Sequence, residues 1–89
     1  MKEGSFLISN QLGFHARAAA QFVKLANAYE CEIYVYKNGE RANGKSILGL
    51  LTLAAAKGAT LRIRADGKDE ETALASLQRL IENKFGEEQ

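Results

Sequence analysis

Hydrophobic residues alternate with polar ones in three parts of the chain, which is the pattern of half-buried strands. Residues 4–9, 31–37 and 60–66 show this period of two. Asn38 and Gly39, a strong signal for a hairpin turn, follow the second run and predict a short return strand over residues 40–43. The pattern therefore predicts four strands.

Between and after these runs the hydrophobic period lengthens to that of a helix. Apolar residues at helical spacing predict a helix over residues 16–28. Its buried face is expected to consist of Ala19, Phe22, Val23 and Ala26. Ser46 is a natural N-cap for a short helix over residues 47–53. A third helix is expected over residues 69–85, because acidic residues begin it and an apolar stripe follows. That stripe consists of Leu74, Leu77, Leu80 and Ile81.

The order of these elements is β-α-β-β-α-β-α. Every strand alternates and none is apolar throughout, so the sheet should be antiparallel, with helices on one face and water on the other. We therefore expect an α+β fold of two layers, a four-stranded antiparallel sheet with three helices on one face. The 89 residues suffice for one hydrophobic core, so a single domain is expected over residues 1–89.

Charge and composition argue against several classes of protein. The net charge of +1 lacks the positive field of a nucleic-acid binder. No apolar run approaches the roughly 20 residues of a membrane span, and the first residues lack the apolar stretch of a signal peptide. We expect a cytoplasmic protein without membrane insertion. Cys31 is the only cysteine and stands outside any metal-ligand spacing, so it is expected to be a core or filler residue.

His15, the only histidine, lies where an irregular loop meets the helix predicted from residue 16. The first amides of a helix have no partner within it, and with the helix dipole they favour an anion. A phosphoryl group on His15 would meet the amides of Ala16 and Arg17, and the Arg17 guanidinium could clamp its oxygens. In a plainer interpretation His15 caps the helix and Arg17 is a solvated surface charge.

The residues around His15 resemble a known family. LGFHAR at residues 12–17 and AAQFV at residues 19–23 are similar to the phosphorylated-histidine motif of HPr, the histidine-containing phosphocarrier of the bacterial phosphoenolpyruvate-dependent phosphotransferase system. Residues 44–58 resemble the regulatory-serine segment of that family, and the resemblance extends from near residue 4 to about residue 83. Ala18 departs from the pattern, because the family usually has proline there, which would stiffen the first helical turn.

The resemblance implies an open-faced β-sandwich in which Nδ1 of His15 carries the phosphoryl group beside Arg17. It implies regulatory phosphorylation at Ser46 by an HPr kinase/phosphorylase, with enzyme I as donor and enzyme IIA domains as acceptors. It also implies a partner-binding surface formed by Ala16, Ala20, Ile47, Leu48 and Leu51. We expect a monomeric phosphoryl carrier rather than an enzyme, without cofactor or metal.

The short helix after Ser46 has more than one interpretation. Ser46 can be a plain N-cap, or an N-cap whose phosphorylation adds negative charge to the surface that presents His15. Ile47, Leu48 and Leu51 cannot all face inward on so short a helix, so an exposed apolar patch is expected. The positive charges expected around it are Arg17, Lys24 and Lys45. Such a patch suits a carrier that docks briefly. The alternative is a regulatory binding protein of the same fold that is switched at Ser46.

A nucleotide-binding pattern competes for the same region. GERANGKS at residues 39–46 matches the P-loop pattern G-x-x-x-x-G-K-S. A hairpin at Asn38 and Gly39 would instead pair residues 40–43 as a strand. The strand over residues 60–66 carries Arg62 and Arg64, so it is not the buried parallel strand that a P-loop enzyme needs. The sequence favours the hairpin.

Overall fold

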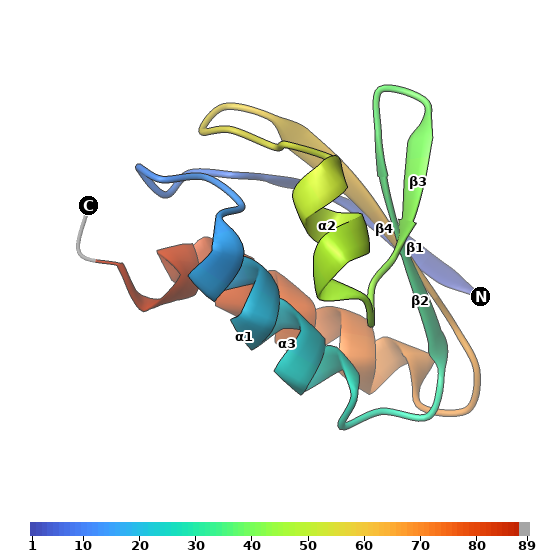
Figure 1. Ribbon diagram of the computed structural model, residues 1–89. Helices are drawn as coiled ribbons and strands as arrows, with labels where there is room; N and C mark the ends of the chain where they lie inside the picture. The colour runs from blue at the N-terminus through green and yellow to red at the C-terminus, as the bar shows by residue number, and fades with distance from the viewer. Residues whose placement is uncertain (88–89) are drawn as a thin grey trace.

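A computed structural model describes residues 1–87 and contains a four-stranded sheet packed against three helices (Figure 1). The elements are β1 (Lys2–Leu7), α1 (Ala16–Ala26), β2 (Glu32–Lys37), β3 (Glu40–Asn43), α2 (Ile47–Thr52), β4 (Thr60–Asp66), α3 (Glu70–Glu82) and the 3-10 helix η1 (Lys84–Gly86). This order confirms the predicted β-α-β-β-α-β-α arrangement.

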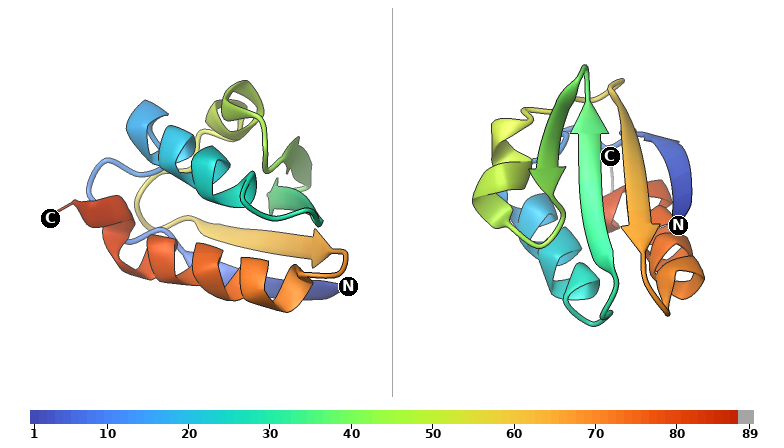
Figure 2. Two further views of the ribbon diagram at one scale, coloured as in Figure 1. Left: turned by 90° about the horizontal axis from the view of Figure 1, so that it is seen from below. Right: turned by 90° about the vertical axis from the view of Figure 1, so that its right-hand side faces the viewer.

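The sheet has the strand order β1-β4-β2-β3, and every neighbouring pair is antiparallel. The right-hand view of Figure 2 shows the open face of the sheet, with the helices behind it. Ile33, Val35, Leu61 and Ile63 point into the core, as the period of two predicted. The alternation is thus explained by one covered and one open face.

The predicted hairpin is confirmed at Asn38 and Gly39, whose φ angles of 50° and 84° suit a tight turn between antiparallel strands. Residues 40–43 pair with β2, so that Glu40 lies opposite Lys37. The ammonium group of Lys45 donates to the Tyr29 carbonyl oxygen at 2.7 Å. A strand paired along its length cannot wrap around phosphates, so residues 39–46 match the P-loop pattern in sequence but not in structure.

Three predicted helix ends differ from the structure. α1 ends at Ala26 instead of residue 28, and α2 ends at Thr52 with Leu53 as its C-cap. α3 ends at Glu82 instead of Phe85, because Lys84 and Phe85 adopt left-handed backbone conformations with φ near 56° and 55°. This turn in the chain buries the Phe85 ring, which stacks on Phe14 with centroids 5.6 Å apart.

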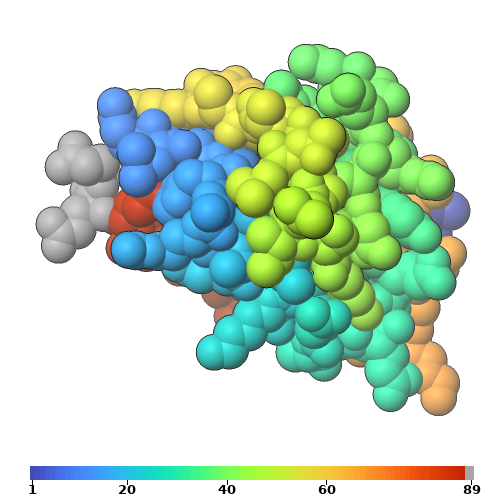
Figure 3. Space-filling model, viewed as in Figure 1, coloured from blue at the N-terminus to red at the C-terminus, as the bar shows by residue number. Residues whose placement is uncertain are grey.

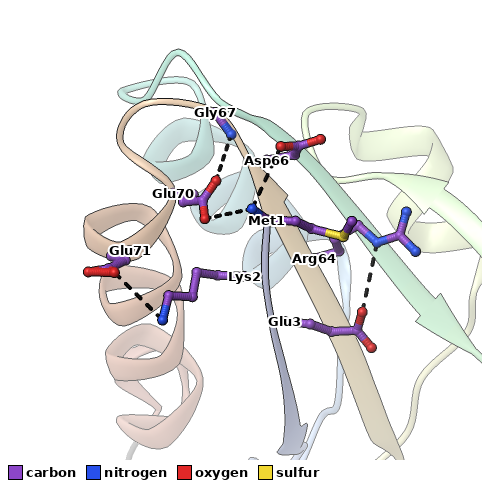
Figure 4. Close-up of polar contacts among 8 residues, drawn as sticks. All are labelled: Met1, Lys2, Glu3, Arg64, Asp66, Gly67, Glu70 and Glu71. Atoms are coloured by element: carbon purple, nitrogen blue, oxygen red, sulfur yellow. Dashed lines mark hydrogen bonds and ion pairs between the residues drawn. The ribbon is translucent and has the colours of Figure 1, made fainter.

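The N-terminal amino group forms ion pairs with acidic residues at and just before the start of α3 (Figure 4). The Met1 amino nitrogen lies 2.8 Å from Oε2 of Glu70 and 3.9 Å from Oδ1 of Asp66. Gly67 N–H donates to the other Glu70 oxygen at 3.1 Å. The hydrogen bond between Met1 and Glu70 raises the pKa of the amino group and lowers the pKa of the carboxyl. These contacts hold the edge strand β1 against the helix that covers it.

Candidate functional site

His15 is the N-cap residue of α1, with an extended backbone and a side chain that bonds no helix amide. The hydrogen bond from Ala19 N–H to the His15 carbonyl oxygen, 2.8 Å long, begins the helix. The amides of Ala16, Arg17 and Ala18 precede that bond, so they have no partner within the helix. His15 is thus the N-cap residue that the plainer interpretation also expected, but its side chain does not bond the helix amides, so these amides remain available to an anion.

The loop before His15 is fixed by Gly13 and Phe14. Gly13 has φ of +69°, and a Cβ placed there would lie 2.7 Å from the Ala55 carbonyl oxygen. That same carbonyl accepts a hydrogen bond from Phe14 N–H at 2.8 Å. The buried Phe14 ring meets Phe22 of α1 edge to face, with centroids 5.5 Å apart. The loop thus packs closely against the segment after α2 and delivers His15 to the start of α1.

The His15 ring is held by Glu87, which lies 72 residues away in the sequence. Nε2 of His15 lies 2.6 Å from Oε2 of Glu87, and the side chains are 26% and 16% exposed. Asn10 Nδ2 donates to the same carboxylate oxygen at 2.8 Å and to the Gly13 carbonyl oxygen at 2.7 Å. Leu12 N–H approaches the other oxygen at 3.4 Å. Neither Asn10 nor Glu87 could be recognised as a site residue from the sequence, since no local pattern links them to His15.

The Glu87 carboxyl is ionised at neutral pH. Its burial would raise the pKa, but the hydrogen bonds from His15, Asn10 and the Leu12 amide outweigh burial and lower the pKa below its ordinary value. A carboxylate only accepts hydrogen bonds, so the proton between the two groups belongs to Nε2 of His15. When the ring is neutral, its lone pair is then on Nδ1.

Arg17 and Ala18 occupy the first turn of α1 in different environments. The Arg17 side chain is exposed, whereas Ala18 is fully buried. Because Ala18 lies before the first helical hydrogen bond, its N–H is a donor that proline could not supply. The departure from the family pattern therefore adds a donor to the helix start.

An apolar surface lies beside this helix start, and we call it the α1–α2 patch. It consists of Ala16, Ala20, Ile47, Leu48 and Leu51. Leu51 is half-buried, and the other four are exposed. Figure 3 shows the blue start of α1 and the yellow-green α2 side by side on one face. Arg17 and Lys24 are exposed as expected. Lys45 is half-buried, and its ammonium group donates to the Tyr29 carbonyl oxygen.

Ser46 is the N-cap of α2, as predicted. Its Oγ accepts a hydrogen bond from Gly49 N–H at 3.1 Å, and its carbonyl oxygen accepts one from Leu50 N–H at 3.0 Å. The side chain is half-buried at the start of the helix that supplies three residues of the α1–α2 patch. A charge added at Ser46 would therefore act at the edge of that patch.

Residues 1–87 contain no cluster of three or more histidine, cysteine, aspartate or glutamate residues placed to hold a metal. No helix among them has the length and apolar character needed to cross a bilayer. Cys31 is buried, as predicted, and burial raises the pKa of its thiol to about 11.

Comparison with known proteins gives consistent matches. The family model described as "PTS HPr component phosphorylation site" matches residues 2–83. Phosphocarrier protein HPr of Neisseria meningitidis serogroup A is 47% identical over 98% of each chain. HPr-like protein Crh of Halalkalibacterium halodurans is 39% identical over 92% of this chain and 98% of that protein. The crystal structure of an HPr from Thermoanaerobacter tengcongensis matches with a TM-score of 0.97 and 44% identity, and both chains are fully covered.

Proposed function

The chain belongs to the HPr family of phosphocarrier proteins, and from this we propose that His15 accepts a phosphoryl group from phosphorylated enzyme I and passes it to enzyme IIA domains. The observation that supports this most directly is the position of His15 at the N-cap of α1, beside three amides without helical partners. Nδ1 is the acceptor atom in this proposal, since Nε2 lies against Glu87.

In the transfer step, the Nδ1 lone pair forms a bond to phosphorus while the bond between phosphorus and the donor nitrogen breaks. The electron pair of that bond returns to the donor. The amides at the start of α1 and the Arg17 guanidinium stabilise the phosphoryl oxygens, so catalysis rests on positioning and charge. The second transfer regenerates His15, and the protein acts as a carrier without turning over a small molecule.

Docking is assigned in this proposal to the α1–α2 patch. Its exposed apolar residues lie on the start of α1 and on the neighbouring α2, and small interfaces of this kind suit partners that must exchange quickly. One copy of the chain is proposed as the carrier, because His15, the helix amides and Glu87 all come from one chain. The same argument supports one carrier domain, since the site joins Asn10 and His15 with Glu87 across most of the chain.

The proposal is tested with radiolabelled phosphoenolpyruvate and enzyme I. We expect acid-labile phosphate on the wild-type protein, none on His15→Ala, and slower labelling of Arg17→Ala because a phosphate ligand is lost. Folding of each variant is checked by its thermal unfolding. If enzyme I labels another HPr but leaves the wild-type protein unlabelled, the proposed function is wrong.

A regulatory binding protein switched at Ser46 is the second candidate. It is favoured by the similarity to an HPr-like protein Crh and by the N-cap position of Ser46, where a phosphate would meet a helix N-terminus. Incubation with ATP and an HPr kinase/phosphorylase would then give acid-stable phosphate that is absent from Ser46→Ala. Such labelling without any acid-labile phosphate on His15 would favour the regulator over the carrier.

A further inference from the structure

We propose that Glu87 is a positioning residue for phosphoryl transfer, which holds Nε2–H of His15 and compensates the positive charge that the ring gains when Nδ1 is phosphorylated. The inference rests on the proposed function of His15. It concerns a residue outside the family match, which ends at residue 83.

The contact has the geometry of a charge-assisted hydrogen bond. Nε2 of His15 and Oε2 of Glu87 are 2.6 Å apart, shorter than an ordinary neutral hydrogen bond. Asn10 is fully buried, and its amide group donates both to Glu87 and to the loop at Gly13. Nδ2 of this buried amide makes both of its hydrogen bonds at the site, while Oδ1 has no partner among residues 1–87. Because a buried amide is costly to leave unbonded, the two bonds of Nδ2 indicate a built site rather than a chance meeting of surface side chains.

The segment that carries Glu87 is itself packed. Phe85 is buried and stacks on Phe14, the residue immediately before His15. Glu87 N–H donates to the Lys84 carbonyl oxygen at 2.9 Å, which closes the turn of η1. The carboxylate is therefore delivered to His15 by a fixed stretch of chain, and Figure 1 shows the red end of the chain beside the blue loop.

The charge balance of the transfer explains what Glu87 does. A neutral ring with its proton on Nε2 attacks through Nδ1, and the electron pair of the breaking donor–phosphorus bond leaves with the donor. Nε2 keeps its proton, so the phosphorylated ring carries a positive charge beside the carboxylate. When the Nδ1–phosphorus bond later breaks, its electron pair returns to Nδ1 and the ring is neutral again. A carboxylate that orients a histidine and stabilises its cation serves acyl transfer in the Ser-His-Asp triad in the same way.

The test compares Glu87→Gln and Glu87→Ala with Glu82→Gln in the full chain. Glu82 is an exposed carboxylate that accepts a hydrogen bond from Gln78, so its replacement controls for the loss of one negative charge. We expect kcat for labelling by phosphorylated enzyme I to fall on the order of tenfold in Glu87→Gln and further in Glu87→Ala. KM should stay unchanged, because Glu87 acts on the ring and not on docking. Glu82→Gln should match wild type.

A second measurement observes the contact directly. In nitrogen-15 NMR spectra, the Nε2 proton of His15 should exchange slowly in wild type and be lost to rapid exchange in Glu87→Ala. Unchanged kcat in both Glu87 variants, or a fall in rate that appears only as a higher KM, would overturn the positioning role. If wild type is not labelled at all, the proposed function fails, whereas the NMR signal still decides whether Glu87 holds Nε2.

Discussion

Gly13 shows at the scale of one residue how the loop places His15. Its positive φ and the nearby Ala55 carbonyl oxygen both disfavour a side chain, whereas Gly39 has a positive φ with no atom near the position of a Cβ. We expect Gly39→Ala to lower the free energy of unfolding by about 1 kcal/mol and Gly13→Ala by at least about 2 kcal/mol, because only the second adds a clash. Urea unfolding measures both.

Equal losses at the two glycines would show that the Ala55 segment simply moves aside. Labelling separates the variants further, since a displaced loop also moves His15. Gly13→Ala should therefore lose phosphorylation under conditions where it is still folded, while Gly39→Ala keeps it.

Residues of the site differ in how far sequence reveals them. His15 and Arg17 are recognisable because a motif and a helix start are local features, readable from a few neighbouring positions. Glu87 carries no such signal. Its contact with His15 depends on left-handed conformations at Lys84 and Phe85, which residues other than glycine seldom adopt and which tertiary packing imposes here.

At the scale of elements, α2 shows two faces with different roles. Leu48 is 78% exposed, whereas Leu50, two positions later, is fully buried. We expect Leu48→Ala to change the free energy of unfolding by less than about 0.5 kcal/mol while raising KM for phosphorylated enzyme I. Leu50→Ala should cost about 2–5 kcal/mol through the cavity it leaves. Denaturant unfolding and labelling kinetics measure the two effects; an unchanged KM in Leu48→Ala would remove it from the docking surface.

The elements themselves were predicted more reliably than their ends. The presence of the strands and of the β2–β3 hairpin follows from alternation and from Asn38 and Gly39, because these signals act over a few residues. The first strand was placed two residues too late, since β1 is Lys2–Leu7 instead of residues 4–9. The predicted end of α3 was wrong, because the apolar spacing in the sequence continues to Phe85 whereas the helix stops at Glu82. Phe85 leaves the helix and stacks on Phe14, a partner so distant in the sequence that no local pattern indicates it.

At the scale of the whole molecule, the site joins segments that lie far apart in the sequence, the loop before α1 and the segment after α3. Phe14 contacts Phe22 of α1 on one side and Phe85 of η1 on the other, so these rings link the His15 loop, the helix start and the segment that carries Glu87. The packing of these buried rings therefore stabilises the fold and also positions the residues of the site.

Replacing Phe85 by alanine tests this link. We expect a loss of about 3–5 kcal/mol in the free energy of unfolding, because the stacked ring leaves a cavity. The amides of Phe14 and His15, which bond to the Ala55 and Gly13 carbonyl oxygens, should then lose more hydrogen-exchange protection than amides of β4. Leu77→Ala, a fully buried change on α3, serves as control and should lower protection in both regions together. If the two variants gave the same exchange pattern, Phe85 would stabilise the core in general, and the loop that presents His15 would owe its position to Gly13 and Phe14 alone.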